Sequence, residues 1–152
     1  MKSMDTTATI LLVEDEPADA HLTRMAFEEA GVTVDLHHVS HGLEALDFLY
    51  RRPPYMEAPR PALILLDLNM PRMNGYEFLD ALRGDATLAD IPVVVLTTSD
   101  VERDLEATRD RGAADYIVKP VDLDVFCHRM SRLAHEWRLP QSGGEQGGGE
   151  AE

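Results

Sequence analysis

Five short apolar runs, separated by stretches with helical periodicity, constrain the fold of this chain more than any other feature. The runs cover residues 10–13, 32–39, 62–66, 93–96 and 116–118. The first, third and fourth are continuous and rich in branched side chains, which is typical of central strands buried on both faces. The second alternates apolar and polar residues, as a strand nearer the edge of a sheet does. We therefore expect five strands, three of them central.

The stretches between the runs carry the boundary signals of helices, such as a proline in the first turn or a glycine just past the last. The predicted helices cover residues 17–30, 43–50, 75–83, 101–111 and 123–137. Strand and helix thus alternate five times, and right-handed crossovers give such a chain a parallel sheet with helices on both faces. We predict an α/β fold with a doubly wound sheet, which binds ligands at the carboxyl ends of its strands.

Composition excludes several classes of function. The 152 residues suit one hydrophobic core, and no apolar run approaches the roughly 18–20 residues that span a bilayer. A net charge of −14 opposes contact with nucleic acid or an anionic membrane, and the single cysteine excludes a disulfide scaffold. We expect a cytoplasmic protein in which residues 8–139 form one domain. Residues 140–152, rich in glycine and glutamate, are expected to be a disordered tail, and the proline-rich residues 51–61 a surface loop.

Acidic residues follow two of the predicted strands directly. Glu14 and Asp15 come after the first run and Asp67 after the third, so they converge if these two strands are neighbours. Two such charges about 4 Å apart repel by roughly 4 kcal/mol at an effective dielectric constant near 20, which calls for a compensating cation. Oxygen ligands without histidine or cysteine indicate Mg²⁺. The alternative, that the acids only stabilise the next helix, is preferred for Glu16 and Asp19.

A hydroxyl and an ammonium group are predicted at the same edge. Thr97 follows the fourth run and Lys119 follows the fifth. The hydroxyl alone is weak evidence, because hydroxyls commonly cap helices. Lysine is rare in this chain, since Lys2 and Lys119 are the only lysines among 14 basic residues. A lysine after a strand is usually exposed to solvent, but here it would face three carboxylates.

Together these residues resemble the receiver domain of two-component response regulators. Residues 65–75, Leu-Leu-Asp-Leu-Asn-Met-Pro-Arg-Met-Asn-Gly, match the phosphoacceptor signature of that family, and the resemblance extends over about residues 8–137. It implies a flavodoxin-like (βα)5 fold with strand order 2-1-3-4-5. The chain is most similar to the single-domain regulators paired with bacterial phytochrome sensor kinases. That narrower resemblance depends on Val13-Glu14-Asp15 followed by Ala18-Asp19, the proline-bearing insertion, residues 92–99 and the aromatic end of the last helix.

The resemblance implies a role for each landmark residue. Asp67 would accept a phosphoryl group from a phosphohistidine of the sensor histidine kinase. Asp15 would ligate Mg²⁺ directly, Glu14 would act through water or by its charge, and Asn69 would offer its backbone carbonyl. These roles agree with the chemistry, because phosphoryl transfer needs in-line positioning and neutralisation of charge on the phosphoryl oxygens.

The remaining landmarks concern charge and switching. Lys119 would supply positive charge, and Thr97 would bond a phosphoryl oxygen once Asp67 is modified. Tyr116 takes the position of the family's rotating aromatic, which would turn inward as Thr97 moves. The alternative is that Tyr116 is simply a half-buried strand residue.

Other chemically interesting residues are assigned structural roles. Cys127 belongs to the apolar stripe of the last helix, and Trp137 continues that stripe, so it either covers the core or contributes to a homodimer contact. Five histidines are interpreted as surface residues away from the carboxylates. They are His37, His38, His41, His128 and His135.

Four functions compete. The leading one is a stand-alone phosphoacceptor switch, not an enzyme, without a DNA-binding output domain and signalling by protein–protein contact. The second is a phosphorelay intermediate that passes the phosphoryl group to a histidine phosphotransfer protein. Haloacid-dehalogenase phosphatases also use an aspartate after a strand, but the second aspartate they need is Asn69 here. A scaffold without phosphoacceptor chemistry has no support, since Asp67, Asp15 and Lys119 are all present.

Overall fold

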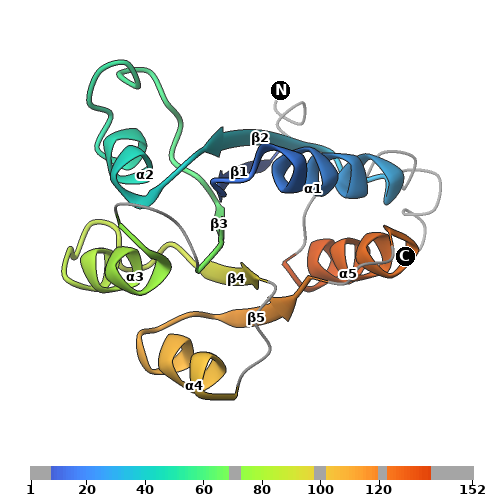
Figure 1. Ribbon diagram of the computed structural model, residues 1–152. Coiled ribbons are helices and arrows are strands. Elements are labelled where there is room, and N and C mark those ends of the chain that lie inside the picture. Colours follow the sequence, from blue (N-terminus) through green and yellow to red (C-terminus); the bar gives the residue numbers. More distant parts are fainter. Residues whose placement is uncertain (1–7, 69–72, 98–101, 120–122, 138–152) are drawn as a thin grey trace.

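A single parallel sheet forms the centre of the molecule. The computed structural model describes residues 8–68, 73–97, 102–119 and 123–137. The strands are β1 (Ala8–Val13), β2 (Val34–Val39), β3 (Leu63–Leu66), β4 (Val93–Thr97) and β5 (Asp115–Val118). All neighbours pair in parallel, in the order β2-β1-β3-β4-β5 (Figure 1). The predicted flavodoxin-like fold and its strand order are therefore confirmed.

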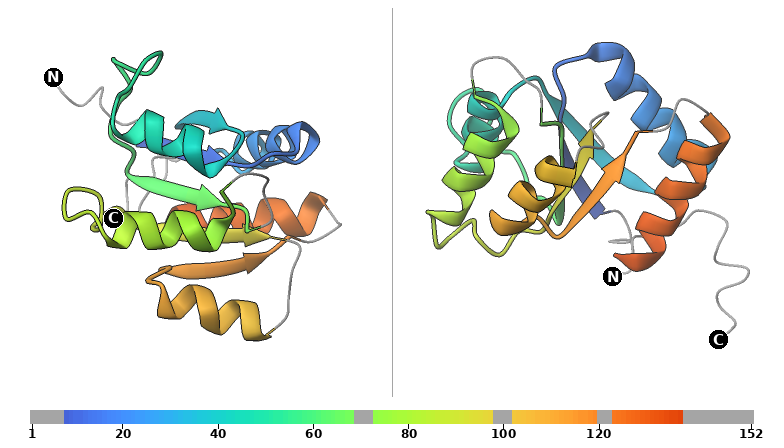
Figure 2. Two further views of the ribbon diagram at one scale, coloured as in Figure 1. Left: turned by 60° about the vertical axis from the view of Figure 1, so that its left-hand side comes forward. Right: turned by 60° about the horizontal axis from the view of Figure 1, so that its bottom comes forward.

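Helices cover both faces of the sheet. They are α1 (Pro17–Glu29), α2 (Gly42–Leu49), α3 (Gly75–Arg83), α4 (Glu102–Asp110) and α5 (Leu123–Glu136). α1 and α5 lie on one face, and α2, α3 and α4 lie on the other (Figure 2). Gly31 and Gly112, which follow α1 and α4, have positive φ angles of 76° and 93°, a conformation that glycine adopts without a steric penalty. Among the described residues, no helix is long and apolar enough to cross a membrane.

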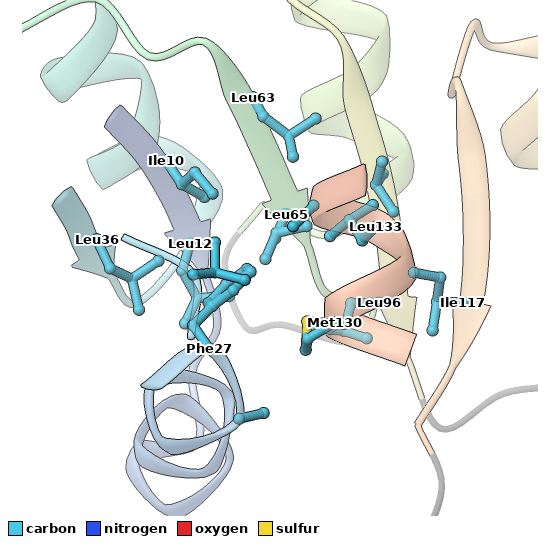
Figure 3. Close-up of a cluster of buried hydrophobic side chains, with 14 of the residues drawn as sticks. Ile10, Leu12, Phe27, Leu36, Leu63, Leu65, Leu96, Ile117, Met130 and Leu133 are labelled. Atoms are coloured by element: carbon cyan, nitrogen blue, oxygen red, sulfur yellow. The ribbon is translucent and has the colours of Figure 1, made fainter. Parts of the chain in front are cut away.

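Two apolar clusters form the core, one on each face of the sheet. Alternate residues of the central strands enter alternate clusters, as in β1, where Ile10 and Leu12 face one cluster and Leu11 and Val13 the other. The cluster under α1 and α5 is drawn in Figure 3. Strands buried on both faces need apolar residues at every position, which confirms the interpretation of the continuous runs in β1, β3 and β4.

β2 is shorter than its apolar run. The run starts at Val32, but the strand begins at Val34. The amide of Val32 donates to the carbonyl of Phe27 at 3.0 Å in the turn that closes α1, and Val32 forms only an isolated β-bridge ahead of the strand. Leu36 faces the cluster under α1 and Val39 faces the other cluster, so both faces of β2 are partly covered.

The surface loop between α2 and β3 is anchored to the body of the protein. Tyr55 and Ala58 pack against the cluster under α2 and α3. The Arg51 guanidinium donates to the carbonyl of Ala58 at 2.7 Å, and the Tyr55 hydroxyl donates to the Glu44 carboxylate of α2. The loop is therefore a folded insertion whose aromatic residue adds to the core. The predicted tail lies outside the described residues. The domain boundary at residue 139 therefore stays a prediction.

Candidate functional site

The register of the sheet brings the acidic residues together. Val13 at the end of β1 pairs with Leu66 at the end of β3. Glu14 and Asp67 are the next residues on each strand, so they leave the sheet side by side. The Asp67 amide donates to the carbonyl of Val13 at 3.0 Å, which ties the two strand ends together. The convergence expected from adjacent first and third strands is therefore observed.

Three carboxylates form a compact cluster at this edge. Glu14, Asp15 and Asp67 each offer one oxygen, and these oxygens all lie within 4.8 Å of one another. Glu14 is 1% exposed and Asp67 7% exposed, whereas Asp15 is exposed. An all-oxygen donor set with one solvent-facing member suits Mg²⁺, which usually binds one or two carboxylates and keeps several waters. The cluster thus fits the metal predicted from the sequence. Asn69, the other predicted ligand, lies outside the described residues.

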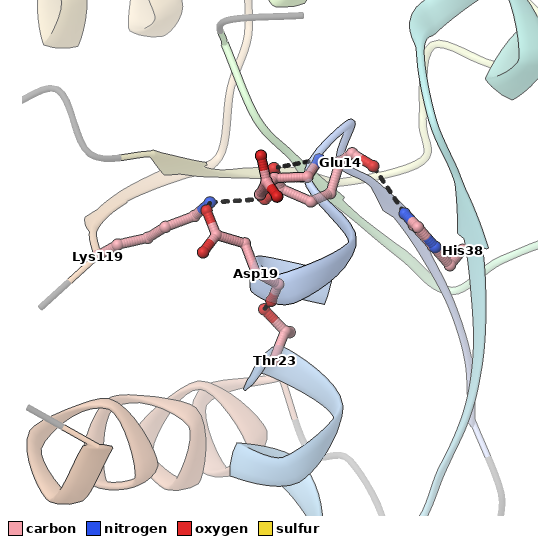
Figure 4. A network of polar contacts seen from close by, with 6 residues as sticks. Glu14, Asp19, Thr23, His38 and Lys119 are labelled. Carbon is pink, nitrogen blue, oxygen red and sulfur yellow. Dashed lines mark hydrogen bonds and ion pairs between the residues drawn. The ribbon is translucent and has the colours of Figure 1, made fainter. Parts of the chain in front are cut away.

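Lys119 reaches this cluster from the end of β5. Its ammonium nitrogen lies 2.6 Å from Glu14 Oε1 and 3.0 Å from Asp19 Oδ2, and its side chain is 9% exposed (Figure 4). Burial lowers the pKa of Lys119, but the bonds to Glu14 and Asp19 and the charge of Asp67 outweigh burial and raise it. Lys119 therefore stays charged at neutral pH and faces the carboxylates, as its sequence position predicted.

Glu14 has an unusual protonation equilibrium. Burial is the largest effect and raises its pKa, the bond and charge of Lys119 lower it, and Asp67 raises it again, so that the pKa is about 7. In the absence of a divalent cation, burial therefore favours the protonated form of Glu14 more than Lys119 favours its charged form. A cation bound beside Glu14 and Asp67 would favour the charged form of both carboxylates.

Thr97 and Tyr116 lie on the neighbouring strands β4 and β5. Thr97 is fully buried, and its carbonyl accepts a hydrogen bond from the Lys119 amide at 2.7 Å. Tyr116 is half-buried and lines a cavity of about 150 Å³ between α4 and β5. The fold therefore brings Thr97 next to Lys119 in the sheet, while the coupled movement of Thr97 and Tyr116 stays a prediction.

Asp19 contributes to the site although the sequence interpretation placed it only in the first turn of a helix. It does lie in the first turn of α1, but its carboxylate also binds Lys119. The signal was available in the spacing, because a residue one turn into α1 returns to the edge where β1 ends. Glu16, the other acid interpreted as stabilising the helix, is the residue before α1. Its side chain makes no capping hydrogen bond.

His38 is exposed, as expected of a surface residue, but it lies beside the acidic cluster and not away from it. Its Nε2 lies 2.6 Å from the backbone carbonyl oxygen of Glu14, so Nε2 carries the proton and donates (Figure 4). His38 pairs with Leu12 across the sheet, and Glu14 is two residues beyond Leu12 on the same face. Diagonal neighbours of this kind lie within reach of a long side chain, so the strand register could have predicted the contact.

The other histidines have structural or surface positions. His41 caps α2, where its Nδ1 accepts a hydrogen bond from the Glu44 amide at 3.2 Å. His37 bonds Asp35 at 2.9 Å at the edge of the sheet. His128 and His135 are exposed on α5. The surface interpretation is therefore confirmed for these four.

The end of α5 packs against the protein's own core. Trp137 and Cys127 are partly buried against the cluster under α1 and α5. This agrees with the first of the two roles considered for Trp137, that of covering the core. The homodimer contact stays a prediction.

Comparison with known proteins places this geometry in a family. The model of the response regulator receiver domain matches residues 10–131. The response regulator Rcp1 of Synechocystis sp. is 41% identical over 118 residues, which cover 77% of this chain and 80% of Rcp1. The crystal structure of the phosphorylated cyanobacterial phytochrome response regulator RcpA superposes with a TM-score of 0.80 at 37% identity, covering 87% of this chain and 94% of RcpA.

A metal-bound relative is similar as well. The Mn²⁺-bound form of Rcp1 superposes with a TM-score of 0.77 at 36% identity, covering 86% of this chain and 94% of that one. Receiver domains bind Mg²⁺ through acidic residues, and the cluster of Glu14, Asp15 and Asp67 provides them here. The fold, the site and these relatives agree: the chain belongs to the response regulator receiver domain family.

Proposed function

We propose that this protein is a single-domain response regulator that accepts a phosphoryl group on Asp67 from a sensor histidine kinase and signals by protein–protein contact. The observation that carries the proposal is the buried ion pair between Lys119 and Glu14 beside Asp67, at the carboxyl edge of the sheet. Burying so much charge is unfavourable for stability alone, because desolvation offsets the attraction. A site that must receive and neutralise an anion accounts for it.

The transfer itself makes few demands on the protein. A carboxylate oxygen of Asp67 attacks the phosphorus of the kinase's phosphohistidine. The new P–O bond forms as the P–N bond breaks, its electron pair stays on the ring nitrogen, and the imidazole takes up a proton. Asp67 is held in place because its amide bonds to Val13. Lys119 provides fixed positive charge for the phosphoryl oxygens, and such preorganised charge is effective in a partly buried site.

The acidic cluster would hold Mg²⁺ through Glu14, Asp15 and Asp67, with the carbonyl of Asn69 as a further ligand. When bound, the ion neutralises charge on the phosphoryl oxygens. The chain's own residues define where it binds, since Glu14 and Asp67 are fixed by the strand ends of β1 and β3. His38 adds to this by bonding the Glu14 carbonyl, which orients the turn that carries Asp15.

Thr97 and Tyr116 form the proposed switch. Thr97 is buried at the end of β4, and the backbone of Lys119 bonds to it, so a shift of Thr97 toward a modified Asp67 is communicated to β5. Tyr116, which lines a cavity next to α4, would then turn inward to fill the space that Thr97 vacates. The phosphoryl group thus biases a two-state packing of β4, β5 and α4.

A phytochrome-type kinase is the proposed partner. Support comes from the similarity to Rcp1 and to RcpA, the latter a phytochrome response regulator by name. The insertion at residues 51–61, which was singled out in the sequence as a mark of this subfamily, is anchored to the protein by Tyr55 and Ala58. A phosphotransfer screen against the sensor kinases of the same organism tests the pairing, and return of label to a histidine phosphotransfer protein would favour a relay.

Labelling with acetyl phosphate tests the phosphoacceptor directly. With Mg²⁺ present, we expect the wild-type protein to take up acid-stable but base-labile phosphate, and Asp67→Asn to take up none because the nucleophilic oxygen pair is lost. Asp90→Asn is the matched control, since Asp90 precedes β4 at the opposite edge of the sheet and is highly exposed. Labelling of Asp67→Asn at the wild-type level would exclude Asp67 as the acceptor.

A further inference from the structure

Lys119 is shared between two acids in very different surroundings. Its ammonium binds Glu14 at 2.6 Å and Asp19 at 3.0 Å, and these two side chains are 1% and 37% exposed. Glu14 follows β1 inside the acidic cluster, whereas Asp19 lies in the first turn of α1 (Figure 4). The lysine therefore has one acceptor inside the site and one at its solvent-facing rim.

The two contacts differ in what it costs to break them. If Lys119 left Glu14, a fully buried carboxylate would lose its partner without water to replace it, which is strongly unfavourable. If Lys119 left Asp19, water would solvate the partly exposed carboxylate, and the loss would be small, as for exposed ion pairs in general. Asp19 is thus the acceptor that Lys119 can exchange.

Asp19 stays in place when the ammonium leaves. It belongs to the first turn of α1, where the helix dipole stabilises a negative charge. The Thr23 hydroxyl donates to the Asp19 carbonyl at 2.9 Å, which reinforces this turn. The carboxylate remains available, so the exchange can be reversed when the phosphoryl group is removed.

We propose that Asp19 is a positioning residue that holds Lys119 at the rim of the unphosphorylated site and gives it up to the phosphoryl group on Asp67, while Glu14 keeps its bond. This inference rests on the proposed function, because it takes Asp67 as the phosphoacceptor. Asp19 never touches the phosphoryl group. Asp19 determines how readily Lys119 moves to the phosphoryl group. It therefore determines the balance between the unphosphorylated and phosphorylated states of the protein.

The scarcity of lysine allows a direct test. Only Lys2 and Lys119 are present, so lysine labelled with ¹³C at Cε gives two NMR signals, and Lys2→Arg assigns them. In the free protein, we expect Asp19→Asn to shift the Lys119 signal. In the complex with Mg²⁺ and beryllium fluoride, which imitates the phosphoryl group, we expect the two proteins to give the same Lys119 signal because the contact is already broken.

The affinity for beryllium fluoride provides a second readout. Losing a partly exposed ion pair that competes with the anion should tighten binding by about two- to fivefold in Asp19→Asn. The matched control is Glu16→Gln, because Glu16 is an exposed acid next to the same turn and no ion pair joins it to Lys119 among the described contacts. Its Lys119 signal should stay where it is, and its affinity should change little.

Two results would overturn the inference. One is a Lys119 signal that Asp19→Asn leaves unchanged in the free protein. The other is a difference between wild type and Asp19→Asn that persists in full in the complex. If the wild-type protein binds no beryllium fluoride and takes up no phosphate, the proposed function fails instead, and the comparison of the free proteins still reports on the contact.

Discussion

Asp15 differs from the other two acids of the cluster in being exposed, while Glu14 and Asp67 are buried. It is therefore the carboxylate that a hydrated cation meets first. Attraction between a carboxylate and a cation about 4 Å apart is worth roughly 4 kcal/mol per unit charge at an effective dielectric constant near 20, so Asp15→Asn should weaken Mg²⁺ binding at least tenfold. Calorimetric titration measures the change. Glu16→Gln, one residue further on, should leave the affinity almost unchanged, and equal losses in both variants would mean that Asp15 is no ligand.

Tyr55 makes the free energy of unfolding depend on pH in the alkaline range. Burial and the hydrogen bond to Glu44 raise its pKa to about 12. The folded state thus keeps a proton that the unfolded chain releases near pH 10, and stability falls as the pH rises from about 10 to 12. In Tyr55→Phe this part of the decline should disappear. Urea unfolding at pH 9 and pH 11 measures it, and a slope equal to that of wild type would contradict the assignment.

At the scale of single residues, the sequence predicted the site residues that directly follow strands. It did not predict the contacts that other side chains make with them. Glu14, Asp67 and Lys119 come directly after apolar runs, and the convergence of strand ends in a parallel sheet brings them together. The contact of His38 depends on the exact register of β2, which hydrophobic periodicity does not define. The start of α1 was predicted, but Asp19 was assigned to stabilising the helix alone, so its bond to Lys119 was missed.

At the scale of elements, the start of α3 is packed tightly against the segment that carries Asp67. A Cβ added at Gly75 would lie 2.8 Å from Leu68 Cα and 3.0 Å from the Asp67 carbonyl oxygen. Gly75→Ala should therefore lower the free energy of unfolding by about 1–3 kcal/mol and slow phosphorylation, since the backbone at Asp67 must shift. Chemical denaturation and acetyl phosphate labelling measure the two effects.

Gly84 offers the matched control for that substitution. It ends the same helix, has a φ of −80°, and an added Cβ would come no closer than 3.4 Å to the nearest carbonyl. Gly84→Ala should change stability by less than about 1 kcal/mol and leave labelling as it is. If both variants were equally stable and equally active, the close approach at Gly75 would have no functional meaning.

The elements themselves were predicted well where a run was long and periodic. The bounds of α3 were predicted residue for residue from the apolar periodicity and the glycine that ends it, whereas the capping box of Asn74 and Glu77 was seen only in the structure. The apolar run starts two residues before β2 because Val32, which forms only an isolated β-bridge, packs against the core in the turn after α1. Packing of the insertion on α2 had no periodic signal, since it depends on one aromatic residue, Tyr55.

At the scale of the whole molecule, the alternation of strand and helix determined the fold. Handedness and the need to bury both faces of a continuous apolar strand leave few topologies for five such units, and the family resemblance specified the strand order. Association of whole molecules is a separate matter, because a patch that covers the core and a patch that binds a second copy have the same apolar composition.

Trp137 allows a test of that association. It packs on the cluster under α1 and α5 while remaining partly exposed. If the end of α5 contributes to a homodimer, Trp137→Ala should shift the mass measured by light scattering toward the monomer. We expect the substitution also to cost about 1–3 kcal/mol of stability, less than for a fully buried tryptophan. If wild type and Trp137→Ala are both monomers at all concentrations, Trp137 only covers the core and the homodimer contact is wrong.

Because the carboxylates come together only in the folded protein, its melting temperature reports which ligand occupies the site. Glu14 and Asp67 meet only when β1 and β3 pair, so the unfolded chain offers a cation nothing comparable. A ligand that binds only the folded state raises the melting temperature. At concentrations above its Kd, the stabilisation grows with the logarithm of the ligand concentration. Melting curves recorded with different divalent ions, with and without beryllium fluoride, would therefore rank occupants of the site without a kinase, a label or knowledge of the signal.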